Sequence, residues 1–204
     1  MTSQYKFSIP SPSGELHGVV HMPVNEPRAI AVVAHPLPTM GGTMDNKIVT
    51  TLVKTFSELG FVALRFNFRG VGESTGVFDE GNGEVDDVLA VVQFAMQEFG
   101  KLPLILSGFS FGGYVQARAA EKLQPQHIVL IAPAVGRFAM PRVAKSTLLV
   151  HGEMDEVVPL NEVLTWAHAQ QLHVVVVPGA THFFHGHLHS IKALVIQFFS
   201  ENVL

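Results

Sequence analysis

The chain has 204 residues, 48% hydrophobic and 15% charged, a composition that excludes a disordered or low-complexity protein. Its 13 basic and 17 acidic side chains give a net charge of −4 with no long run of either sign, so a nucleic-acid-binding surface is not expected. Cysteine is absent, which excludes disulfides, thiolate nucleophiles and cysteine-ligated metals.

The length favours one domain over residues 1–204. No apolar stretch approaches the ~20 residues that a membrane-spanning helix needs. The first residues also lack the apolar segment of a signal peptide. We therefore expect a cytoplasmic protein that has neither a membrane nor a nucleic acid as partner, and the oligomeric state stays open.

The chain opens with two alternating runs, residues 4–10 and 15–23, which predict an antiparallel hairpin at a sheet edge. Later runs are continuously apolar and rich in β-branched residues, as in strands that are buried on both faces. These predicted strands cover residues 29–35, 61–68, 102–109, 127–132, 147–151 and 173–178.

Segments with helical spacing lie between the strands, at residues 46–59, 84–99, 111–123, 160–171 and 188–199. The alternation predicts an α/β fold, in which a mostly parallel sheet has helices on both faces. Residues 133–146 are too short to hold a separate lid domain. Ligand sites of such sheets lie at the carboxyl ends of the strands.

Two stretches fit the G-x-S-x-G pattern of a serine nucleophile, at residues 108–112 and 72–76. Ser110 stands between a predicted strand and a predicted helix, where a sharp turn would present its hydroxyl and the glycines would relieve crowding. An ordinary helix N-cap is the alternative for Ser110. Ser74 is followed by a predicted loop, and we interpret it as a turn serine.

A nucleophilic serine needs a base and a carboxylate that orients the base, and in this topology they follow in the order Ser, Asp or Glu, His. After Ser110 the chain contains one aspartate, Asp155. It follows a predicted strand, and we therefore place it at the same sheet edge. Glu153 and Glu156 are the alternatives.

Four histidines, His182, His185, His187 and His189, follow the last predicted strand. His182 is nearest the strand end and is the predicted base, with His185 as the alternative. The spacing of the four could also chelate a metal. However, the tract has no carboxylate or cysteine and turns helical at residue 188, so neither a metal nor a cofactor is expected.

A tetrahedral intermediate needs two backbone N–H donors. Phe111, immediately after the predicted nucleophile, supplies one candidate. Pro36 and Pro38 have no N–H, so Leu37 offers the first free amide after the strand at residues 29–35. A plain turn before the next helix is the alternative for this loop.

The stretch at residues 66–72 has the glycines of a dinucleotide-binding loop but lacks the helix that should follow at once. We instead expect Arg69 to brace loops near the site, through Asp86 or Asp87. Several apolar side chains could line an acyl pocket, although core packing is at least as good an interpretation of each. They are Phe78, Phe109, Phe138, Met140 and Phe183.

Five ordered stretches give the chain a family likeness: residues 35–47, 67–74, 108–113, 151–159 and 180–184. The chain resembles the α/β-hydrolase superfamily over nearly its whole length, most of all small lidless bacterial serine hydrolases that are carboxylesterase-like and related to dienelactone hydrolases. The resemblance implies Ser110, Asp155 and His182 as the catalytic triad. It also implies Leu37 and Phe111 as the oxyanion-hole amides. Dienelactone hydrolases have cysteine in place of Ser110, so their lactone substrate is not carried over.

We therefore expect a serine hydrolase with an open site that cleaves small carboxylic esters through an acyl-enzyme. A thioesterase, an amidase or an acyltransferase could use the same residues. A binding protein that keeps the fold without turnover, or a metalloenzyme built on the histidine tract, are alternatives from other classes.

Overall fold

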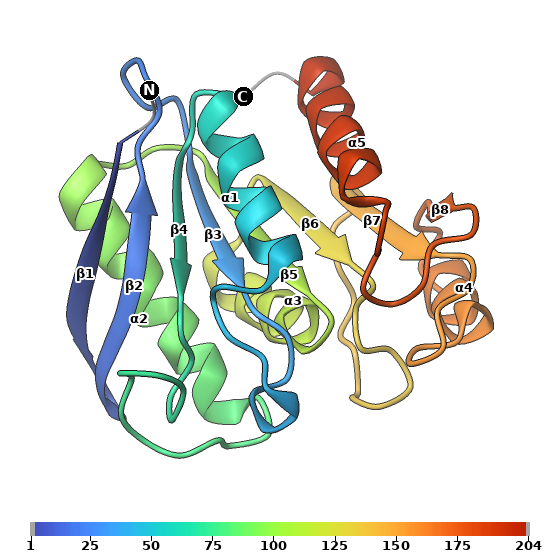
Figure 1. Cartoon of the computed structure of the whole chain (residues 1–204), viewed down its shortest axis with the longest axis horizontal. Helices are drawn as coiled ribbons and strands as arrows, with labels where there is room; N and C mark the ends of the chain where they lie inside the picture. Colours follow the sequence, from blue (N-terminus) through green and yellow to red (C-terminus); the bar gives the residue numbers. More distant parts are fainter. Residues whose placement is uncertain (1–2, 203–204) are drawn as a thin grey trace.

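The computed structural model describes residues 3–202 as one eight-stranded sheet covered by helices (Figure 1). The strands are β1 (Gln4–Ser11), β2 (Gly14–His21), β3 (Ile30–Ala34), β4 (Val62–Phe66), β5 (Leu104–Phe109), β6 (His127–Ile131), β7 (Thr147–Gly152) and β8 (Val175–Val177). Their order across the sheet is β1-β2-β4-β3-β5-β6-β7-β8. The β1–β2 and β2–β4 pairs are antiparallel and all later pairs are parallel, which confirms the predicted edge hairpin.

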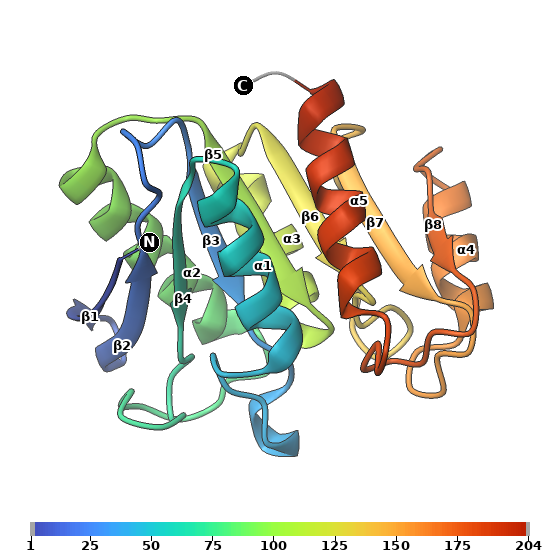
Figure 2. The same cartoon turned by 45° about the horizontal axis from the view of Figure 1, so that its top comes forward.

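Helices cover both faces of the sheet, as predicted (Figures 1 and 2). They are α1 (Lys47–Glu58), α2 (Asn82–Phe99), α3 (Phe111–Leu123), α4 (Leu160–His168) and α5 (Leu188–Glu201), with a short 3-10 helix, η1 (Pro38–Met40). Helices α1 and α5 lie side by side on one face, and α2, α3 and α4 cover the other. None of the helices within residues 3–202 is both long and apolar enough to cross a bilayer.

The central strands are buried on both faces, which explains their continuous apolar runs. Val32 of β3 and Leu64 of β4 pack toward α2 and α3. Their chain neighbours Val33 and Ala63 pack toward α1 and α5. Successive side chains of a strand point to opposite faces, so a polar residue at any of these positions would be buried.

Element ends differ from prediction by a few residues, for local reasons. Helix α4 ends at His168 and not at residue 171, because Gln171 takes a left-handed φ of 56° and Leu172 N–H turns back to the Ala167 carbonyl at 3.0 Å. Helix α2 begins at Asn82, two residues early, where the Glu84 carboxylate accepts the Gly81 N–H at 2.7 Å.

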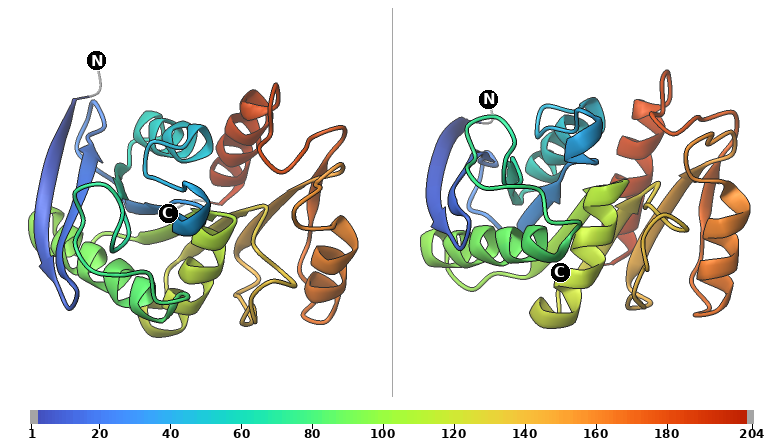
Figure 3. Two further views of the ribbon diagram at one scale, coloured as in Figure 1. Left: turned by 60° about the horizontal axis from the view of Figure 1, so that its bottom comes forward. Right: turned by 90° about the horizontal axis from the view of Figure 1, so that it is seen from below.

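The carboxyl ends of the parallel strands meet along one edge, which Figure 3 shows from below. Residues 132–146, between β6 and β7, follow an irregular path there and form no helix. No lid domain is inserted in this segment, as the sequence predicts.

Candidate active site

Ser110 occupies the sharp turn between β5 and α3. Its backbone has φ 53° and ψ −117°, a conformation that L-residues rarely adopt and that costs about 1–3 kcal/mol. The flanking glycines permit it, because a Cβ at Gly108 would overlap the Gly112 backbone and a Cβ at Gly112 would overlap the Ala34 carbonyl. Ser110 stands at the N-cap position of α3, but its side chain caps no amide of that helix, so it is not an ordinary N-cap serine.

His182 lies in the loop after β8 and contacts both other residues of the predicted triad. Its Nε2 is 3.0 Å from Ser110 Oγ, and its Nδ1 is 2.8 Å from Asp155 Oδ2. With a proton on Nδ1, the ring donates to Asp155 and can accept the Ser110 hydroxyl proton on Nε2. The backbone N–H of His182 donates to Glu156 Oε2 at 3.2 Å, which holds the loop in place.

The Asp155 carboxylate is fully buried in the turn after β7. Its Oδ1 accepts the N–H groups of Val157 at 2.9 Å and Val158 at 2.7 Å. Burial alone would raise the pKa of Asp155, but the hydrogen bonds from His182 and from these two amides outweigh it and lower that pKa below its ordinary value. The carboxylate is therefore ionised at neutral pH.

The residues that the sequence offered as alternative acid, base or nucleophile, or as metal ligands, have other surroundings in the structure. Glu153 Oε2 accepts the Gly179 N–H at 2.8 Å, and Glu156 binds only the backbone of His182. His185 is exposed. Ser74 is buried between the Asn67 carbonyl and a backbone N–H, as expected of a turn serine. Within residues 3–202, no group of three or more His, Asp or Glu side chains could hold a metal ion.

Leu37 and Phe111 line a cavity of about 260 Å³ together with Ser110 and His182. Phe111 is the first residue of α3, so its N–H has no partner inside the helix. Leu37 precedes η1, whose turn closes through hydrogen bonds from Met40 and Gly42 to the Leu37 carbonyl. Among the described residues the Leu37 N–H donates to no acceptor, so both amides are available to a ligand in the cavity.

Two buried histidines whose roles the sequence analysis missed support these loops. His35, one residue past β3, donates from Nδ1 to the Pro36 carbonyl at 2.7 Å, and its Nε2 accepts the Phe68 N–H at 3.0 Å. Burial lowers the pKa of His35 to about 4, so the ring is neutral and both bonds form. It ties the loop that carries Leu37 to the loop after β4.

His151, in β7, is the second of these histidines. Its Nε2 donates to the Val158 carbonyl at 2.9 Å and lies 3.4 Å from Asp155 Oδ2. Burial lowers the pKa of His151, so an uncharged ring lies beside the carboxylate. The only sequence signal for either role is a histidine at the carboxyl end of a buried strand.

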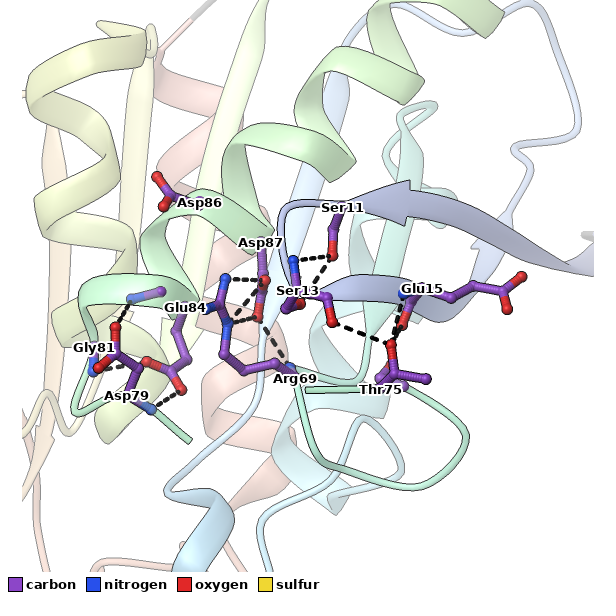
Figure 4. A network of polar contacts seen from close by, with 12 residues as sticks. Ser11, Ser13, Glu15, Arg69, Thr75, Asp79, Gly81, Glu84, Asp86 and Asp87 are labelled. Carbon is purple, nitrogen blue, oxygen red and sulfur yellow. Dashed lines mark hydrogen bonds and ion pairs between the residues drawn. The ribbon is translucent and has the colours of Figure 1, made fainter. Parts of the chain in front are cut away.

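Arg69 braces the loop between β4 and α2, and Asp87 is its partner (Figure 4). The backbone N–H, Nε and Nη2 of Arg69 all donate to the Asp87 carboxylate, at 2.8 to 3.1 Å. Burial would lower the pKa of Arg69, but Asp87 raises it through hydrogen bonds and charge. Asp86 instead lies 4.0 Å from Lys122. The prediction of a bracing role is confirmed, with Asp87 as the partner.

The five predicted pocket side chains divide into three groups. Phe138 and Phe183 line the cavity at Ser110, and Phe78 lines a depression next to it. Phe109 is buried in the core, although its ring lies 5.0 Å from the ring of His182, and Met140 is half-buried and packs against the core.

Known proteins resemble this chain in sequence and in structure. The family model described as serine aminopeptidase, S33, matches residues 25–146. An uncharacterised protein of Rickettsia prowazekii is 32% identical over 189 residues, which cover 85% of this chain and 79% of the relative. XC6422 from Xanthomonas campestris, described as an α/β serine hydrolase without a lid, has a TM-score of 0.93 and 37% identity over 98% of this chain and 95% of its own. An α/β serine hydrolase homologue from Coxiella burnetii has a TM-score of 0.87 and 38% identity over 97% of each chain.

Proposed function

Because this chain belongs to the α/β-hydrolase superfamily, in the family described as serine aminopeptidase, S33, we propose that it cleaves small carboxylic esters with a Ser110–His182–Asp155 triad. The observation that carries the proposal is the hydrogen-bonded line from Ser110 Oγ through His182 to Asp155. Ser110 and His182 also border the cavity that two free amides share. The proposed nucleophile, base, orienting acid and oxyanion donors therefore lie close enough together to act on one substrate.

In the acylation step, Ser110 Oγ forms a bond to the ester carbonyl carbon while its proton moves to His182 Nε2. Asp155 accepts the hydrogen bond from Nδ1 and stabilises the imidazolium. The amides of Leu37 and Phe111 donate to the oxyanion. As the tetrahedral intermediate collapses, the alcohol leaves with the proton from His182, and the acyl group remains on Ser110.

In the deacylation step, a water molecule gives one proton to His182 Nε2 and its oxygen attacks the acyl carbon. The bond to Ser110 Oγ then breaks, and the proton on His182 returns to Ser110. The products are the carboxylic acid and the free enzyme, so each turnover consumes one water molecule.

The cavity supports esters of small acids as the substrate class. Its volume of about 260 Å³ suits a short acyl chain, and Phe138 and Phe183 supply apolar walls. The described residues that line it include neither Asp nor Glu, so they offer no carboxylate for the terminal ammonium of a peptide. For this reason we place esters ahead of the aminopeptidase activity that the family description names.

Labelling with a fluorophosphonate probe tests the proposed nucleophile, together with turnover of p-nitrophenyl acetate and butyrate. Ser110→Ala is expected to abolish labelling and to lower kcat by about 10⁶-fold. Ser107→Ala is the matched control, because Ser107 is a buried serine of β5, the strand that leads to Ser110, and its hydroxyl has no partner among the described residues.

Two results would overturn the proposal: equal labelling of Ser110→Ala and the unchanged protein, or a folded wild-type protein that hydrolyses none of the esters. A matched p-nitroanilide and an acyl-CoA, assayed beside the esters, separate an amidase or a thioesterase from an esterase that uses the same serine.

A further inference from the structure

Arg137 is the one arginine among the six in the chain that forms no hydrogen bond or ion pair with another of residues 3–202. Its guanidinium lies 6.0 Å from the centre of the Phe138 ring and is otherwise exposed. The other arginines all donate to the protein: Arg28 to Leu59, Arg65 to Asp45, Arg69 to Asp87, Arg118 to Asn82 and Tyr114, and Arg142 to Ala169. A guanidinium carries five N–H donors, and those of Arg137 are free for a ligand.

The position of Arg137 relates these free donors to the proposed chemistry. Among the described residues that line the cavity at Ser110, Arg137 is the one side chain with a permanent charge. It also borders the neighbouring depression of about 500 Å³, whose lining includes Glu80, Asn82 and Tyr114. Any ligand that extends from the cavity into the depression passes Arg137.

The backbone around Arg137 is held in place, although the side chain itself is exposed. The Phe138 N–H donates to the Ala134 carbonyl at 3.2 Å. The Phe138 ring stacks on Tyr114 at 4.7 Å and lies 5.2 Å from the ring of Phe111. The residue next to Arg137 is therefore fixed against the first turns of α3, directly beside the nucleophile.

We propose that Arg137 binds an anionic oxyacid group on the substrate, a carboxylate or a phosphate, so that the preferred esters carry a negative charge. This inference rests on the proposed esterase function. A guanidinium presents parallel N–H groups that match the two oxygens of such an anion. The anion could lie on the acyl part or on the alcohol part of the ester, because Arg137 borders both hollows.

Two carboxylates near Arg137 limit where the anion can lie. Glu80 lines the depression, and Glu162 packs against Gly136. Neither forms an ion pair with Arg137, so neither neutralises its charge by contact. Both carboxylates repel the anionic group of the substrate. We therefore expect that group on the side of Arg137 that faces Ser110.

The test compares kcat/KM for three esters of similar size. Neutral p-nitrophenyl butyrate is the reference. The mono-p-nitrophenyl ester of glutaric acid carries the charge on the acyl part, and 4-carboxyphenyl butyrate carries it on the leaving group. Arg137→Gln is expected to lower the ratio of anionic to neutral kcat/KM by about tenfold to hundredfold for one of the anionic esters, mainly through KM.

Two further variants sharpen the result. Arg137→Lys keeps the charge but loses the fork of donors, so its ratio is expected between those of wild type and Arg137→Gln. Arg142→Gln changes an arginine of the same irregular segment that does not border the cavity, and its ratio is expected to match wild type. Added salt should reduce the anionic preference of wild type.

Unchanged ratios in Arg137→Gln for both anionic esters, or an equal change in Arg142→Gln, would overturn the assignment of Arg137. The proposed esterase function fails separately, if wild type hydrolyses none of the three esters. If the neutral ester is hydrolysed but Arg137→Gln leaves the ratio of anionic to neutral kcat/KM unchanged, the anion site is contradicted and the esterase function is not.

Discussion

Asp155 and Asp87 both have fully buried carboxylates, but their charges are held in different ways. Asp87 faces the permanent cation of Arg69, and all four of its hydrogen bonds come from that one residue (Figure 4). Asp155 has no permanent cation as partner. Its hydrogen bonds come from two backbone amides and from the ring of His182.

The difference separates a fixed ion pair from a hydrogen-bonded line that moves a proton under the proposed function. Arg69 remains protonated throughout the accessible pH range, so Asp87 can hold a loop but cannot assist a proton transfer. The hydrogen bonds from His182 and the two amides keep Asp155 ionised. Under the proposed function, this carboxylate stabilises His182 when the ring takes the proton of Ser110. We therefore expect changes at Asp155 to affect rate and changes at Asp87 to affect stability.

Asp155→Asn is expected to give the largest effect in this comparison, a fall in kcat of about 10⁴-fold for p-nitrophenyl butyrate. The asparagine amide can donate to Nδ1 of His182, which places the ring proton on Nε2, where it cannot accept the Ser110 proton. Steady-state kinetics measure the loss, and thermal unfolding checks that the fold is kept. Glu156→Gln is the control, because Glu156 contacts only the backbone of His182. A loss below tenfold in Asp155→Asn would remove Asp155 from the triad.

Asp87→Asn is expected to lower the free energy of unfolding by about 3–5 kcal/mol, because the largely buried guanidinium of Arg69 loses its partner charge. The kcat of the folded protein should stay close to wild type, since Asp87 contacts none of the reacting groups. Urea denaturation measures the stability. Asp86→Asn is the matched control, because Asp86 is half exposed and its 4.0 Å pair with Lys122 contributes at most about 1 kcal/mol. Equal losses in the two variants would show that burial of the Arg69 pair does not matter.

Leu37→Pro tests whether the backbone N–H of Leu37 contributes to catalysis. Leu37 has a φ of −52°, which proline can adopt, so the substitution removes the N–H with little change of the backbone. A fall in kcat of about 10²–10³-fold is expected if this amide binds the oxyanion. Leu37→Ala keeps the N–H and loses the buried side chain, so it should retain most of kcat. Equal activities of the two variants would exclude the Leu37 amide as a donor.

The fold could be predicted from the sequence because its signals are local. Strands buried on both faces give continuous apolar runs. The helices between them repeat their apolar residues with the helical period of about 3.6 residues. The start of α2 was missed by two residues because it depends on the side chain of Glu84 reaching back to Gly81. The end of α4 depends on one left-handed residue, Gln171, which no periodicity indicates.

The site could be predicted only in part. The pattern around Ser110, the single later aspartate and the histidine nearest the last strand point to Ser110, Asp155 and His182. The structure brings these three side chains within hydrogen-bond reach. His35, His151 and Arg137 were not predicted. The Phe68 partner of His35 comes from another loop, the Val158 partner of His151 lies seven residues further along the chain, and Arg137 has no partner among residues 3–202. Whether a histidine at a strand end is buried and neutral depends on the neighbours that cover it, and a single sequence does not record them.

His35 is a third buried group, and like Asp87 it is expected to affect stability and not rate. Its expected effect is the smallest of these predictions. Its pKa is about 4 in the folded protein against 6.5 when unperturbed, so between these values the unfolded chain binds a proton that the folded chain does not. The contribution of the neutral ring is therefore complete above pH 6.5 and is lost as the pH falls toward 4. It amounts to about 3 kcal/mol at 1.36 kcal/mol for each pKa unit.

Urea denaturation at pH 7, 5.5 and 4.5 measures this contribution as a difference between wild type and His35→Gln, which cannot titrate. His21 and His151, whose pKa values burial also lowers, contribute a fall in both proteins and cancel in the difference. The wild type should lose up to about 3 kcal/mol more than His35→Gln over this range. His173→Gln changes an exposed histidine and controls for the loss of a ring as such. Parallel pH profiles for wild type and His35→Gln would show that the stability of the fold does not depend on a neutral His35.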